Sequence, residues 1–126
     1  MSQRDFFIKN GIVINGGVTE LSQNPTISSG TLTLDLSTGS IFTVNLSSSI
    51  TTLNIINPSP TGSVSSFCLN TVGTGAAIAI SWPSGVKWPS GTAPTVTTTN
   101  GKQDLYTFFT LNNGNNYFGI ISGQNF

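Results

Sequence analysis

Residues 31–46 read TLTLDLSTGSIFTVNL, and this stretch decides the fold class of the chain. Leucine occupies every second position from Leu32 to Leu36, and the same period returns in the run Ile41–Leu46. A period of two places alternate side chains on opposite faces of a strand. Because the run Ser37–Ser40 between them is typical of a turn, the stretch predicts two strands, each with one buried face.

The rest of the chain repeats this pattern of short apolar runs separated by turn residues. Glycine, proline, serine, threonine and asparagine interrupt every window long enough for a helix. Further strands are expected at 50–56, 63–72, 76–82, 105–111 and 117–121. This spacing is typical of an all-β fold, and we expect an antiparallel β-sandwich that resembles a jelly roll. Short threonine-rich strands leave the strand order open.

The start of the chain differs in pattern from the remainder, and we interpret residues 1–29 as an N-terminal arm and 30–126 as the β-sandwich domain. Asn10–Gly11 lies between two apolar groups, which favours a hairpin turn. Exposed apolar residues and a free strand edge both favour contact with another protein. The candidate assembly contacts are Phe6, Phe7, Ile8, Ile12, Val13 and Ile14. The alternative is that the arm folds back as an edge hairpin of its own domain.

Composition narrows the classes of function. Only 6% of the 126 residues are charged, the net charge is zero and histidine is absent. A typical soluble chain has about 25% charged residues. The few Lys and Arg residues are scattered, whereas nucleic-acid binding needs them clustered. A surface with so little charge favours association, so we expect a component of an assembly. No signal peptide or membrane-spanning stretch is recognisable.

Catalysis is not expected from these residues. Histidine, the usual general base, is missing, and the four acidic residues lack the spacing of a calcium loop. Gly73–Gly75 is not followed by a helical pattern, so the glycines do not form a nucleotide-binding motif. We therefore assign no catalytic, cofactor-binding or metal-binding residues.

Two single residues have a structural and a functional interpretation. Cys68 has no cysteine partner and lies in an apolar run, so we interpret it as a small buried residue. Asp104 leads directly into the strand expected at 105–111. We interpret Asp104 as an acceptor of backbone N–H groups that fixes the preceding loop. Contact of Asp104 with a sugar or a partner protein is the alternative.

The sequence Trp-Pro-Ser-Gly occurs twice within Ser81–Gly91 and contains both tryptophans of the chain. One interpretation is a ligand platform on which a sugar stacks, made of Trp82, Lys87, Trp88, Tyr106 and Tyr117. The other is a structural clip, because proline holds the residue before it extended and Pro-Ser-Gly supplies a turn. Each ring would then be pinned against the end of the sandwich. We favour the clip.

A set of spaced residues resembles a β-rich module that recurs in structural proteins of tailed bacteriophages, over roughly residues 40–121. The residues that carry the resemblance are Trp82-Pro83-x-x-Val86-Lys87-Trp88, Gly91-x-x-Pro94, Gly101-Lys102-x-Asp104-x-Tyr106-x-Phe108 and Tyr117-x-Gly119. The resemblance implies a virion protein, often trimeric, with no catalytic residues.

From this resemblance we expect a trimeric capsid decoration or cement protein. It would be made in the host cytoplasm, bind the major capsid protein or another virion protein, and stabilise the shell at the particle surface. A tail-fibre or receptor-binding module that contacts host glycans is the alternative. The module fills nearly the whole chain, which favours a small accessory protein over a long fibre. A carbohydrate-binding module of an enzyme is a third interpretation, and enzymatic activity is not expected.

Overall fold

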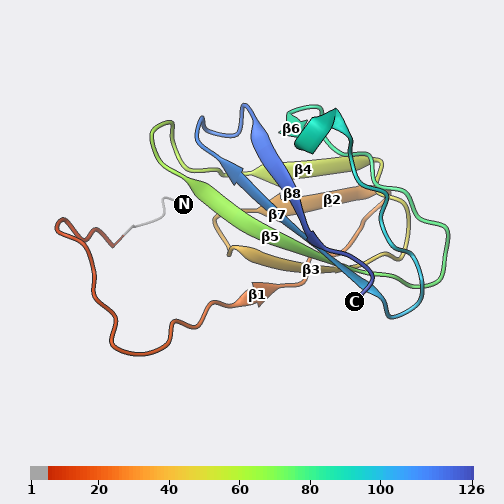
Figure 1. Cartoon of the computed structure of the whole chain (residues 1–126), viewed down its shortest axis with the longest axis horizontal. Helices are drawn as coiled ribbons and strands as arrows, with labels where there is room; N and C mark the ends of the chain where they lie inside the picture. Colours follow the sequence, from red (N-terminus) through yellow and green to blue (C-terminus); the bar gives the residue numbers. More distant parts are fainter. Residues whose placement is uncertain (1–5) are drawn as a thin grey trace.

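The computed structural model describes residues 6–126, and strands dominate this part of the chain (Figure 1). The strands are β1 (Ser22–Gln23), β2 (Thr31–Asp35), β3 (Ile41–Asn45), β4 (Thr52–Ile56), β5 (Ser65–Val72), β6 (Val86–Lys87), β7 (Gln103–Thr110) and β8 (Tyr117–Gly123). A single 3-10 turn, η1 (Pro89–Gly91), lies between β6 and β7 in the described chain. The all-β class is therefore confirmed. Within residues 6–126, no helix has the length and apolar character needed to cross a membrane.

Six strands form one mixed sheet in the order β1-β3-β5-β7-β8-β6, and β2 pairs with β4 in a second sheet. Antiparallel pairing occurs between β5 and β7 and between β7 and β8. The other four pairs are parallel, so the prediction of antiparallel pairing throughout is wrong. The reason is that the chain alternates between the sheets from β2 to β5. Two reversals separate β3 from β5, so these neighbours run in the same direction.

The two sheets share one hydrophobic core. Alternate residues of β2 and β3 are buried, as the period-two pattern predicted, and Leu32, Leu34, Phe42 and Val44 are at most 1% exposed. The same cluster includes buried side chains of the other long strands, namely Leu53, Phe67, Leu69, Tyr106 and Phe108. The apolar faces of both sheets are therefore removed from water together, which is the main favourable term in folding.

The central pair β5–β7 holds the larger sheet together. Its register runs without interruption from Ser65 opposite Thr110 to Val72 opposite Gln103. On the buried face the rings of Phe67 and Phe108 are stacked, with centroids 5.0 Å apart. Cross-strand aromatic pairs of this kind stabilise a sheet beyond ladder hydrogen bonding.

Two expected elements are not formed. The prediction of a hairpin within residues 6–14 is wrong, because these residues contain a turn at Lys9–Asn10 but no strand. The strand expected at 76–82 is reduced to a single bridge between Ile50 and Ile80. Residues 47–49 beside it lie outside any strand, so little extended backbone is available for pairing.

The arm leaves the body at β1, which pairs with the first two residues of β3. Residues 6–21 run away from the body along the lower left of Figure 1. The first five residues of the expected arm lie outside the described residues. The boundary at residue 29 stays a prediction, although contact with the larger sheet begins at Ser22.

Candidate functional site

The two tryptophans pack against each other and against the inner face of β7. Trp82 and Trp88 meet edge to face with ring centroids 5.0 Å apart, and Trp82 lies 5.1 Å from Tyr106. The backbone of Trp88 is extended before its proline, as its sequence predicted. The indole N–H of Trp82 donates to the carbonyl oxygen of Pro94 at 3.3 Å. The Trp-Pro segments thus fasten the loop between β6 and β7 over the core, in keeping with the clip interpretation.

The predicted ligand platform is not an exposed surface. Trp88, Tyr106 and Tyr117 are buried, with at most 8% of each residue exposed. Trp82 is half-buried, and Lys87 alone among the five is exposed. The platform interpretation is therefore wrong for the three buried rings, because a sugar cannot reach their faces. A sugar-binding platform and a core cluster are built from the same aromatic residue types. Residue type alone therefore does not distinguish the two interpretations.

Asp104 is the most connected polar group described in the chain. Its carboxylate is fully buried. One oxygen, Oδ2, accepts hydrogen bonds from the backbone N–H of Thr97 at 2.7 Å and from the hydroxyl of Tyr106 at 2.8 Å. It also accepts from the side-chain amide of Gln124 at 3.1 Å. The other oxygen accepts from the backbone N–H of Asn125 at 2.9 Å. Asp104 therefore fixes the loop before β7, as we interpreted from the sequence, and the chain end as well.

These contacts set the charge state of the Asp104–Tyr106 pair. Burial by itself would raise the pKa of the Asp104 carboxyl, but the hydrogen bonds from Thr97, Asn125 and Gln124 outweigh it and lower the pKa below the usual 3.8. Burial, together with the adjacent carboxylate, raises the pKa of Tyr106 far above 10. The pair is a carboxylate with a neutral phenol at ordinary pH, which suits a structural role better than proton transfer.

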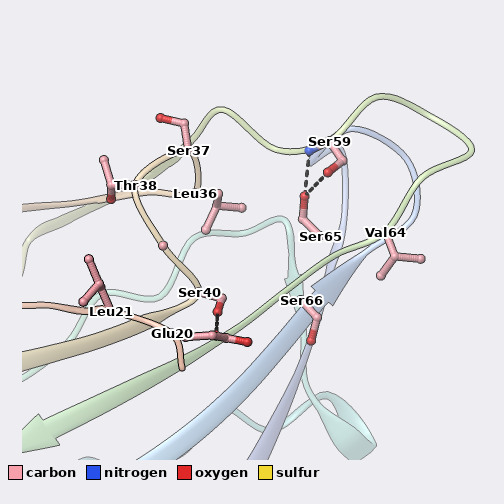
Figure 2. A pocket seen from close by; sticks show the side chains of 11 residues that line it. Glu20, Leu21, Leu36, Ser37, Thr38, Ser40, Ser59, Val64, Ser65 and Ser66 are labelled. Atoms are coloured by element: carbon pink, nitrogen blue, oxygen red, sulfur yellow. Dashed lines mark hydrogen bonds between the residues drawn. The ribbon is translucent and has the colours of Figure 1, made fainter. Parts of the chain in front are cut away.

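An open groove of about 520 Å³ lies where the arm joins the body (Figure 2). Hydroxyl groups from the β2–β3 turn, the β4–β5 loop and the start of β5 line it, next to one carboxylate and three apolar side chains. The lining residues are Glu20, Leu21, Leu36, Ser37, Thr38, Gly39, Ser40, Ser59, Val64, Ser65 and Ser66. This groove could not be predicted from the sequence, because serine and threonine are so frequent in the chain that a cluster of them carries little information.

Several polar groups in the groove already bind one another. The hydroxyl of Ser40 donates to Glu20, which fastens the base of the arm to the body. Figure 2 shows the hydroxyl of Ser65 accepting from the backbone N–H of Ser59 at 2.6 Å and donating to the hydroxyl of Ser59 at 2.9 Å. The chain contains no histidine, which is the residue that most often activates a serine. In the part of the chain that the structure describes, no three His, Cys, Asp or Glu side chains gather as metal ligands.

Cys68 does not supply a nucleophile either. It lies on β5 between the buried residues Phe67 and Leu69, so its side chain points to the opposite, outward face of the sheet. There it is half-buried, whereas we expected a buried residue. Burial raises the pKa of the thiol, which keeps it protonated and unreactive at neutral pH.

A second cavity, which we call the β8 pocket, lies on the outer side of the larger sheet. It has a volume of about 340 Å³ and is lined by Lys87, Trp88, Pro89, Phe109, Phe118, Gly119 and Ile120. The rings of Phe109 and Phe118 are stacked beside it, 5.0 Å apart. The sequence carried a signal for this surface, because apolar residues occupy both faces of 117–121 instead of alternating.

The apolar arm residues are all exposed. Phe6 is 89% and Val13 is 96% exposed, and Phe7, Ile8, Ile12 and Ile14 are exposed as well. The structure therefore leaves the candidate assembly contacts available to another molecule. It does not bring them to the groove or to the β8 pocket of the same chain.

Comparisons with known proteins add no family to this picture. No protein-family model, curated protein or solved structure matches the chain. A functional proposal consequently depends on the residues and surfaces described above.

The Asp104 contacts predict an acid-sensitive contribution to stability. Asp104→Asn should lower the free energy of unfolding at pH 7 by about 1.5–3 kcal/mol, because the charge-assisted hydrogen bonds are lost. Since the folded-state pKa of Asp104 lies below 3.8, its contribution is present above that pH and disappears as the pH falls through the folded-state pKa. Urea unfolding of the wild-type and Asp104→Asn proteins at a series of pH values, from about 2 to about 7, measures this pH dependence.

Asp35→Asn is the matched control. Asp35 accepts hydrogen bonds from Ser37 and Asn57 at the surface, so its replacement should cost less than about 1 kcal/mol. Equal losses for the two variants at pH 7, or a loss for Asp104→Asn that persists unchanged in acid, would contradict the role given to Asp104.

The clip predicts that Trp88 acts through stability. Trp88→Ala should lower the free energy of unfolding by about 3–5 kcal/mol, because it removes a buried ring that lies against Tyr106 and Phe108. The neighbouring exposed change Lys87→Ala should alter it by less than about 0.5 kcal/mol. Thermal and chemical unfolding give both values. Unchanged stability of Trp88→Ala together with lost ligand binding would instead support a platform.

Proposed function

We propose that this chain is a structural protein of a tailed-bacteriophage particle, most specifically a trimeric decoration or cement protein. In this proposal its two sheets pack as a sandwich that stands on the shell. The arm joins it to neighbouring proteins, the major capsid protein among them. The observation that carries the proposal is the exposed apolar arm on a well-packed β-body with few charges. The resemblance of residues 40–121 to phage virion modules supplies the biological setting.

The arm has a physical reason to bind. Burying a Phe, Ile or Val side chain that was exposed contributes about 1.5–3 kcal/mol. Six such side chains lie within residues 6–14. Ordering the arm costs conformational entropy, on the order of 1–2 kcal/mol per residue. Contact through the arm is favourable only when a partner covers several of these side chains at once, which is what a protein lattice offers.

The lack of charge fits the same role. Four basic and four acidic residues in 126 give a net charge of zero, so electrostatic attraction supplies little affinity. Apolar burial and backbone hydrogen bonding would have to hold the protein in place. Such a contact is insensitive to salt, unlike binding to nucleic acid. We propose accordingly that the protein is made in the host cytoplasm and is retained on the particle surface.

The hydroxyl-lined groove favours a second candidate function. A tail-fibre or receptor-binding module would contact host glycans, and hydroxyl groups with one carboxylate are suitable hydrogen-bond partners for a sugar. No exposed aromatic ring lines the groove. The groove therefore supports a function less strongly than the arm does. In the receptor-binding alternative, the groove would take the place of the predicted tryptophan platform as the glycan site. No enzymatic activity is proposed.

The proposal is tested on particles of the phage that encodes the chain. Tagged full-length protein should co-sediment with purified particles and label the capsid surface in immunogold electron microscopy. Deletion of residues 2–21, which ends just before β1, should remove binding, while circular dichroism shows that the β-body is still folded. Glu20→Gln, which changes the groove and keeps the arm, is the control and should bind normally.

Three outcomes are informative. Normal binding of the deletion protein would contradict the role of the arm. Label at the tail tip, or loss of binding with Glu20→Gln alone, would favour the receptor-binding alternative. Absence of the full-length protein from particles would overturn the virion proposal.

A further inference from the structure

The far edge of the larger sheet contains an unpaired stretch of strand. β8 pairs with β7 on one side, whereas on the other side β6 covers only Tyr117 and Phe118. No strand in the described chain pairs with Gly119–Gly123 on that side. Ile120 and Ile121 within this stretch are 45% and 41% exposed. An exposed, apolar strand edge is suited to accept an additional strand from another chain.

The β8 pocket lies at the same edge and is almost wholly apolar. Phe109, Phe118 and Ile120 line it from the sheet, and Trp88 and Pro89 line it from the clip. Lys87 is the one charged residue in the lining. An occupant must therefore bring apolar side chains on an extended backbone. Its hydrogen-bonding groups would pair with Gly119–Gly123 while its side chains fill the pocket.

The arm is a segment of this kind. Residues 11–14 form neither a helix nor a strand within their own chain, and Ile12, Val13 and Ile14 are exposed. Phe6 and Phe7 would bury about 300–500 Å² between them. This is a large part of the roughly 800 Å² that each partner contributes to a stable interface. The remaining aliphatic side chains of the arm add to it.

The exposed arm is not docked on the β8 edge of its own copy, so that edge is open to the arm of a second copy. The arm departs next to β1 at one end of the six-stranded sheet, whereas β8 and β6 form the other end. Four strand spacings of about 4.8 Å, roughly 19 Å, separate β1 from β8. In Figure 1 the arm loops out on the left, apart from the strands of its own body. A contact from one edge to the opposite edge of the next copy is heterologous, and repetition of it forms a ring when the rotation between copies closes.

We propose that the N-terminal arm of one copy docks on the β8 edge of a neighbouring copy. Residues of the arm add a strand to Gly119–Gly123, and their apolar side chains occupy the β8 pocket. Three such contacts close the trimer. The inference rests on the proposed role of the arm as an assembly contact, and it names the surface that receives the arm.

A complementation experiment with purified full-length protein tests this contact. V13D introduces a charge in the arm, and I120D introduces one in the receiving edge. Each variant alone should fall from a mass of three chains to one chain in light scattering after size exclusion. A mixture of the two should form dimers, because a V13D copy has an intact edge and an I120D copy has an intact arm. The dimer should not add further copies, because its unused arm carries V13D and its unused edge carries I120D.

A control variant and a folding measurement distinguish loss of the contact from other effects of an added charge. L111D places the same charge at a half-exposed position in the turn after β7 and should leave the trimer intact. Circular dichroism establishes that each variant is folded. If I120D does not fold, I121D replaces it at the neighbouring exposed position.

A trimeric V13D protein, or a mixture that stays monomeric, would overturn the inference. A wild-type chain that is monomeric at all concentrations would overturn it too. Particle binding is measured separately, so the two proposals can fail independently. A monomeric protein that still binds particles would contradict the arm exchange alone. A ring that does not bind particles would contradict the virion role alone.

Discussion

The body of this protein depends on one buried carboxylate. Asp104, which has no exposure to solvent, receives hydrogen bonds from the loop before β7, from Tyr106 and from the chain end. An unpaired carboxylate in this place would be strongly destabilising. The four donors make it an anchor instead. Tyr106 is held by the same group, and the two tryptophans pack on Tyr106.

The chain divides its apolar residues between two tasks. Those of the strands alternate and are buried in the core shared by the two sheets. Those of the arm and of the outer face of β8 remain in water, at opposite ends of the larger sheet. With so few charges on the surface, exposed apolar groups are not balanced by repulsion between copies. The self-association that we propose through these two surfaces is compatible with this composition.

The sequence predicted the faces of the strands well, and the pairing of the strands poorly. A period of two identifies which side of 31–36 and 41–46 is buried, because the core covers one face of each. The period of two contains no information on which strands are neighbours in a sheet. Ile41 pairs with Cys68, far along the chain, and the alternation between sheets that makes this pair parallel depends on the packing of the whole core.

The candidate site shows the same division. The role of Asp104 could be predicted, since aspartate before a strand commonly fixes a loop through local N–H groups. Its contact with Asn125 could not, because it joins distant parts of the chain. The tryptophans allowed two interpretations, since a ring that stacks on sugar and a ring that fills a core have the same chemistry. Only their burial separates the two.

The central claim is that the arm is free within one copy and becomes ordered on another. Hydrogen–deuterium exchange of the full-length protein, measured at a dilution that gives monomers and at a concentration that gives oligomers, tests it most directly. In the monomer, the amides of 6–14 should exchange as an open chain while those of Gln103–Thr110 stay protected. In the oligomer, the amides of 6–14 and of Gly119–Gly123 should become protected together. Protection of the arm at every concentration would show that it folds on its own body and would contradict the account.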